Sequence, residues 1–143
     1  MGLDEEVAGE LERSADRARA RGGTAAAAAF LQRAIELTPD LERRGVRALA
    51  AAQTQLEAGS SDTAYELVAT AEIGPLDQLQ RAQAERLRAE IAFARRRGSD
   101  AAPLLLKAAK RLEPLDAELA RDTYLEALSA ALYVGRMTGH AGA

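Results

Sequence analysis

The sequence predicts an all-α fold, an antiparallel array of helix hairpins with about seven helices on a superhelical course. Composition is the first reason, because 34 Ala and 20 Leu stand against four Val, three Ile and 3% aromatic residues. Ala and Leu favour helices, whereas β-branched and aromatic residues favour strands. The second reason is a period near 38 residues in the residues that end helices. Glycines recur at Gly22, Gly59, Gly98 and Gly135, and prolines recur at Pro39, Pro75 and Pro114.

The first predicted hairpin spans residues 4–37. Its first helix runs from Asp4 to Arg21, with acidic residues at its start and arginines at its end, as the helix dipole favours. Thr24 is the expected N-cap of the second helix, and Pro39 marks the point beyond which that helix cannot continue.

Two further hairpins follow the same marks. The second spans residues 40–73, and the third spans residues 76–112 with Ser99 and Asp100 as the N-cap of its second helix. The connections are short, which forces helices that are sequential in the chain to be antiparallel neighbours.

An unpaired helix over residues 116–134 closes the array, and residues 136–143 are expected to form a flexible tail. No shift in composition marks a boundary between domains. We therefore expect a single helical-repeat domain over residues 1–135, stabilised by contacts between neighbouring helices.

The residues needed for most catalytic chemistry are missing from these 143 residues. The chain has no Cys, and its one His is His140, so cysteine nucleophiles, disulfides and histidine-centred metal sites are excluded. No glycine-rich phosphate loop is present. Glu5, Glu6, Glu10 and Glu12 are better explained by the acidic bias of a helix N-terminus than by a cation site. We expect a non-catalytic chain without cofactor or metal.

The charge balance and the apolar runs exclude further classes. Nineteen basic against 22 acidic residues give a net charge of −3, which is not typical of direct nucleic-acid binding. The acidic start is unlike a signal peptide. The longest apolar run, residues 25–31, is too short to span a bilayer. We expect a cytoplasmic chain without membrane contact.

Three arginines form the first candidate site. Arg43, Arg44 and Arg47 lie near a helix start, where the dipole disfavours cations. They are candidates for contact with an anion or another polar group. The alternative is pairing with the nearby carboxylates Glu36, Asp40 and Glu42.

The last helix holds the second candidate site. Its apolar residues exceed what one neighbouring helix needs, and the chain supplies no eighth helix to cover them. Leu125, Leu128, Leu132 and Tyr133 form the candidate interaction face. Either the chain comes from a longer array, or this face pairs with another molecule.

Four runs carry a family resemblance: residues 18–40, 48–53, 92–106 and 111–128. The most specific of them is RLEPLDAELARDTYLEAL at residues 111–128. These runs resemble the helical-repeat region of large LuxR-type transcriptional regulators of actinobacteria, and the likeness extends over residues 4–136. The repeats look tetratricopeptide-like, although Leu, Val or Ala fills most of the positions at which that motif has aromatic residues.

The resemblance implies an interior fragment of a regulator similar in layout to the activator of the maltose regulon. Such regulators join an N-terminal signal-transducing ATPase, a helical array and a C-terminal helix-turn-helix, so ATP and DNA binding would belong to parts outside this chain. The fragment itself would bind a protein partner or a small effector. The alternative is a free-standing scaffold that forms a homodimer through its last helix.

Overall fold

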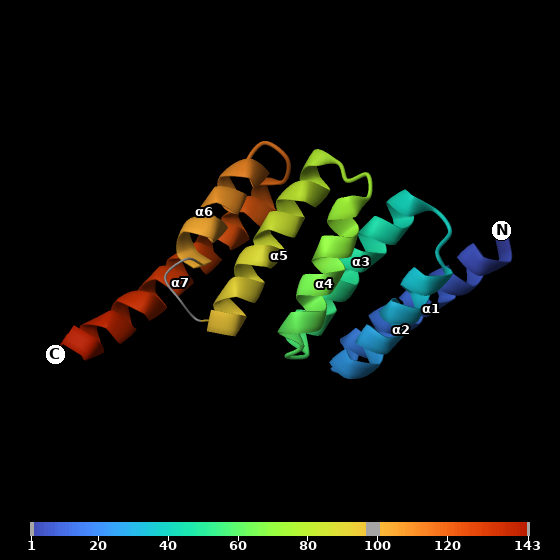
Figure 1. Ribbon diagram of the computed structural model, residues 1–143, viewed down its shortest axis with the longest axis horizontal. Coiled ribbons are helices and arrows are strands. Elements are labelled where there is room, and N and C mark those ends of the chain that lie inside the picture. The colour runs from blue at the N-terminus through green and yellow to red at the C-terminus, as the bar shows by residue number, and fades with distance from the viewer. Residues whose placement is uncertain (1, 97–100, 143) are drawn as a thin grey trace. The chain divides into compact units, whose positions relative to one another are not determined.

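The structure is a computed structural model that describes the backbone of residues 2–96 and 101–142. The all-α prediction is confirmed, because every regular element in these residues is a helix (Figure 1). The described helices are α1 (Gly2–Ala20), α2 (Thr24–Leu37), α3 (Leu41–Glu57), α4 (Ser61–Ile73), α5 (Gln78–Arg96), α6 (Ala101–Leu112) and α7 (Ala117–Gly142).

The helices belong to two compact units, residues 1–76 and 77–143. In the first unit, α1 packs on α2, α2 on α3 and α3 on α4; in the second, α5 packs on α6 and α6 on α7. Neighbouring helices within a unit are antiparallel, as expected for helix hairpins (Figure 1). The single domain expected over residues 1–135 stays a prediction.

Glycine turns close the first two hairpins in the same way. Gly22 and Gly59 have φ of 81° and 88°, a conformation that a side chain disfavours. The amide after each turn glycine donates to a carbonyl five residues back: Gly23 to Ala18 at 2.8 Å, and Ser60 to Gln55 at 2.8 Å. These two glycines, which recur in the sequence 37 residues apart, therefore form the same backbone turn.

Two other turn predictions have different outcomes. Gly98 lies outside the described residues, as do Ser99 and Asp100. The prediction that the last helix ends at residue 134 is wrong, since α7 continues through Gly135 to Gly142. A lone glycine lowers helix stability without ending the helix, and no proline follows to force a stop.

Aspartates begin three of the long helices. The side chains of Asp40, Asp77 and Asp116 accept from the amides three residues later, at 3.0, 2.7 and 3.0 Å. Gln80 also accepts from the Asp77 amide at 2.8 Å, which completes a reciprocal capping box. The prediction of Thr24 as an N-cap is wrong, because Gly23 occupies that position and Thr24 is the first residue of α2.

Alanine dominates the core. Of the 30 buried apolar residues in the described part of the chain, 20 are Ala, so helix backbones approach closely. Gly45 extends this trend, since a Cβ there would lie 3.2 Å from Leu76 Cδ2. Some larger apolar residues lie outside the core, among them Val7 and Phe30, which are exposed.

Among the described residues, no helix has an apolar stretch long enough to cross a membrane.

We predict that Asp77→Ala lowers the free energy of unfolding by about 1 kcal/mol, because the Gln80 amide loses the Asp77 carboxylate as its acceptor. Urea unfolding followed by circular dichroism measures the change. Asp16→Ala, at an exposed position inside α1, is the control and should change stability by less than about 0.5 kcal/mol. An equal loss in both variants would contradict the capping role.

Candidate functional site

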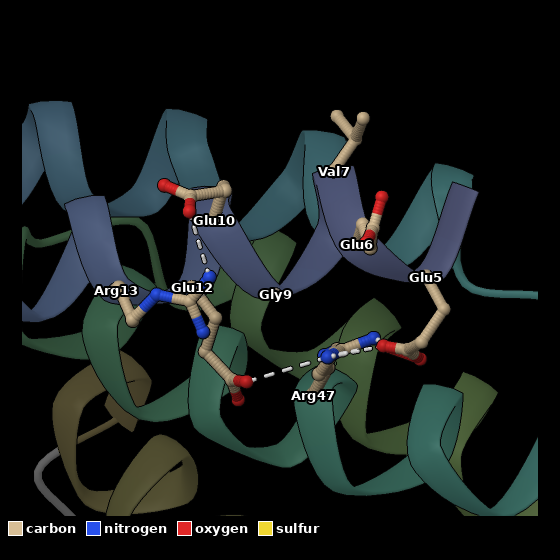
Figure 2. A pocket seen from close by; sticks show the side chains of 8 residues that line it. All are labelled: Glu5, Glu6, Val7, Gly9, Glu10, Glu12, Arg13 and Arg47. Carbon is tan, nitrogen blue, oxygen red and sulfur yellow. Dashed lines mark hydrogen bonds and ion pairs between the residues drawn. The ribbon is translucent and has the colours of Figure 1, made fainter. Parts of the chain in front are cut away.

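Arg47 is the centre of a polar network in the first unit. Its side chain is 8% exposed and reaches from α3 to α1. It forms a two-pronged ion pair with Glu5, with Nη1 at 3.1 Å from Oε1 and Nη2 at 2.8 Å from Oε2. Nη2 also lies 3.4 Å from Glu12 Oε1. Figure 2 shows Arg47 between these two carboxylates, which are two helical turns apart on α1.

The same guanidinium reaches the end of α2. Arg47 Nη1 donates to Thr38 Oγ1 at 2.7 Å, and that buried hydroxyl donates to the Ala34 carbonyl at 2.6 Å. Arg44 donates to the Thr38 carbonyl through Nε at 3.0 Å and Nη2 at 2.7 Å. Cations stabilise helix C-termini, so these arginines at the start of α3 stabilise the end of α2.

The network shifts the pKa of both partners of the main ion pair. Hydrogen bonds from Arg47, and then from Arg43, hold the pKa of Glu5 below its ordinary value of 4.5 against an opposing effect of desolvation. The hydrogen bonds with Glu5 raise the pKa of Arg47. Both shifts favour the charged forms, so the pair is ionised at neutral pH.

The candidate anion site at Arg43, Arg44 and Arg47 is thus occupied by the protein's own groups. Arg43 lies 3.2 Å from Glu5, and Arg47 contacts Glu5 and Glu12. The carboxylates expected as partners make other contacts: Glu36 pairs with Arg33 at 2.9 Å, and Asp40 caps α3. The long-range partner Glu5 was missed because no local rule connects residues 42 apart.

An open hollow of about 760 Å³ borders this network on α1 (Figure 2). Four glutamates line it together with Arg13 and Arg47, and Glu10 pairs with Arg13 at 2.9 Å. The described residues contain no group of three or more carboxylate, histidine or cysteine side chains arranged to hold a metal ion. The glutamates here are largely engaged in ion pairs.

The exposed leucines of α7 form the second surface. Leu125, Leu128 and Leu132 are 57%, 55% and 60% exposed, and their spacing of three and four residues places them along one stripe of the helix. We call these three residues the leucine stripe. Tyr133 differs from them: it is half-buried, and its ring packs edge-on against Phe93 of α5 at 5.4 Å.

A hollow of about 400 Å³ adjoins the leucine stripe. Ala117, Ala120, Tyr124, Leu125 and Leu128 form its apolar wall, and Glu113 and Arg121 form its polar edge. The Tyr124 hydroxyl donates to Glu113, and this hydrogen bond raises the pKa of the tyrosine.

The core side of α7 was not found from the sequence. Ala120, Thr123, Ala127 and Ala130 are buried, and the larger leucines face away from them. Alanine therefore fills most of the close contacts of α7. The expectation of an apolar surplus on α7 is borne out by the exposure of the leucine stripe.

No protein-family model matches the chain, and no curated protein and no solved structure shows significant similarity to it.

We predict that Arg47→Met lowers the free energy of unfolding by about 2 kcal/mol, because Glu5, Glu12 and the Thr38 hydroxyl lose a charged hydrogen-bond donor. Equilibrium urea unfolding measures it. Arg43→Met is the matched control, since Arg43 contacts the same Glu5 but is 63% exposed; its cost should stay below about 1 kcal/mol. Equal costs would contradict a special role of the buried arginine.

We predict that acid weakens the first unit through Glu5. Because the folded pKa of Glu5 lies below 4.5, its contribution is present above pH 4.5 and is lost as pH falls through the folded value. The urea midpoint should therefore fall more steeply with decreasing pH in the wild type than in Glu5→Gln. Parallel pH profiles for the two proteins would exclude this contribution.

Proposed function

We propose that this chain is a non-catalytic, cytoplasmic interaction module that binds a partner protein or a small effector. The observation that carries the proposal is the leucine stripe, Leu125, Leu128 and Leu132, on the last helix of the described array. Apolar side chains gathered on one face beside a hollow are typical of surfaces that bind other molecules. Arrays of helix hairpins commonly present such surfaces.

The chemistry of the chain supports a binding role over a catalytic one. The sequence has no Cys and one His, and the most elaborate polar cluster in the described residues is the Arg47 network. Its groups contact one another and the end of α2, which is a structural arrangement. A catalytic site would instead direct unpaired acid, base or nucleophilic groups into a cavity.

We further propose that the module comes from a LuxR-type transcriptional regulator. The support is the resemblance of the four runs named above together with the sequential helix hairpins. Sequencing the gene's surroundings tests this origin. A nucleotide-binding P-loop encoded upstream and a helix-turn-helix downstream in the same reading frame are expected, and a frame limited to these 143 residues would refute it.

We predict that Leu128→Glu in such a regulator abolishes the transcriptional response to its partner or effector, because a carboxylate is placed in the apolar stripe. A reporter gene measures the response, and DNA binding by the helix-turn-helix should be unchanged. Leu41→Glu is the matched control, since Leu41 is 60% exposed on α3 in the other unit. Equal responses of wild type and Leu128→Glu would contradict the proposed surface.

The alternative function, a scaffold that dimerises through α7, rests on the same exposed stripe. Sedimentation of the purified chain separates the two. A dimer that Leu128→Glu converts to a monomer supports the scaffold, whereas a wild-type monomer supports a module that binds a different molecule.

A further inference from the structure

The buried faces of α2 and α6 follow the same pattern. Three apolar positions of α2 are at most 2% exposed: Ala27, Leu31 and Ala34. The residues that follow them by 74 in the chain are at most 3% exposed in α6: Ala101, Leu105 and Ala108. Because the buried positions coincide, the outward positions of the two helices can be compared at the same separation.

The outward face of α2 shows what neighbouring helices leave open at this place in a hairpin. Within its unit, α2 packs on α1 and α3, and α4 follows in the same unit. Its outward residues Gln32, Arg33 and Glu36 are nevertheless exposed. The helix α6 has the corresponding neighbours, since it packs on α5 and α7. Helices that follow in the array therefore leave the outward face of α6 open.

The charges on this face differ between the two helices. In α2, Arg33 and Glu36 form an ion pair with Nη1 at 2.9 Å from Oε2. The equivalent residues of α6 are Lys107 and Lys110, and both are exposed. Opposite charges three residues apart on a helix attract each other, whereas like charges repel. Where α2 forms an ion pair, α6 thus places two cations side by side.

No carboxylate of the chain compensates these two lysines. Residues 101–112 include no acidic residue, and Glu113, which is within helical reach of Lys110, accepts from the Tyr124 hydroxyl. In the part of the chain that the structure describes, neither lysine forms an ion pair. The helix dipole stabilises cations in the last turn, which includes Lys110 but not Lys107. The dipole therefore accounts for only one of the two cations.

Two exposed leucines flank the lysines. Leu104 and Leu106 are 44% and 40% exposed, and the helical spacing places them on either side of the row that the two lysines form. The position of Leu106 is occupied in α2 by the polar residue Gln32. Unpaired cations thus lie next to apolar surface. We call this surface the basic face of α6; it consists of Leu104, Leu106, Lys107 and Lys110.

We propose that the basic face of α6 binds an acidic segment of a partner protein. Two carboxylates of that segment, one helical turn apart, pair with Lys107 and Lys110, and an apolar side chain beside them packs on Leu106. Charge complementarity selects the segment, and the apolar contact adds binding energy because exposed ion pairs alone contribute little. The basic face is separate from the leucine stripe, so this inference goes beyond the proposed function and does not rest on it.

The number of unpaired cations distinguishes an acidic segment from a lipid surface or a nucleic acid. Arg111, the third basic residue of α6, pairs with Glu85 at 3.3 Å. Binding to anionic lipids through charge takes a cluster of about four to eight Lys or Arg. Phosphate backbones are contacted by basic and polar side chains and offer no apolar surface to the leucines. Two lysines between two leucines match two carboxylates beside an apolar side chain.

A synthetic peptide, AELAAELAAELA, is the probe. Its glutamates recur every fourth residue, with a leucine beside each. Titration into the isotope-labelled chain should shift the NMR signals of residues 103–110 and reach half-saturation at about 1 mM or below. The matched control is AQLAAQLAAQLA, which keeps the leucines and removes the charge. Its half-saturation should be at least about tenfold higher.

Two changes should weaken binding of the glutamate peptide by at least about fivefold. One is Lys107→Gln combined with Lys110→Gln, because both ion pairs are lost. The other is a rise in NaCl from about 20 mM to about 500 mM, because salt screens exposed charges. Arg13→Gln combined with Arg33→Gln removes the same charge from exposed positions of the first unit and should leave binding unchanged. Leu128→Glu should also leave it unchanged, which separates this test from that of the leucine stripe.

Several results would overturn the proposal. These are no saturation up to about 5 mM peptide, equal binding of the glutamate and glutamine peptides, and binding that the double lysine variant leaves unchanged. Self-association of the chain in sedimentation, abolished by the lysine variant, would overturn it in favour of a second copy. Binding to phosphatidylserine vesicles or duplex DNA that the lysine variant abolishes, in the absence of peptide binding, would assign the face to a lipid surface or a nucleic acid instead.

Discussion

The first unit depends on the placement of one buried cation. Arg47 cannot lie at 8% exposure without carboxylates and acceptors around it, because an unpaired buried charge costs several kcal/mol. Glu5 of α1 and the Thr38 hydroxyl at the end of α2 supply them. The relative positions of three helices are therefore coupled to one side chain, and a shift of any of them by one turn would leave a charge without its partner.

This coupling matters because the shapes of the buried apolar side chains do little to fix the positions of the helices. Alanine side chains at Ala48, Ala51 and Ala52 are fully buried, but methyl groups interlock less than large side chains and leave helices free to slide. Polar contacts at defined positions supply the missing specificity. In the second unit, the ion pair between Arg86 of α5 and Glu126 of α7, at 2.6 Å, joins two helices in a comparable way.

Local chemistry explains which parts of the fold the sequence predicts. Helix propensity and the positive φ at Gly22 and Gly59 depend on neighbouring residues, so helices and turns are readable from the chain. The packed faces and Arg47's partners depend on distant segments. A four-residue step drifts around a 3.6-residue helix, so apolar residues spaced by four do not share one buried face: Ala15 of α1 is buried, whereas Val7 is exposed.

The same reasoning separates the two candidate sites. Arg43, Arg44 and Arg47 lie at the start of α3, where the helix dipole disfavours cations. Arg44 and Arg47 are nevertheless stabilised there, because both contact Thr38 at the end of α2. No comparable neighbour among the described residues covers the leucine stripe. Covering these three leucines would contribute about 1 kcal/mol each. Covering the stripe with another molecule would therefore stabilise a complex, which is the physical basis of the proposed function.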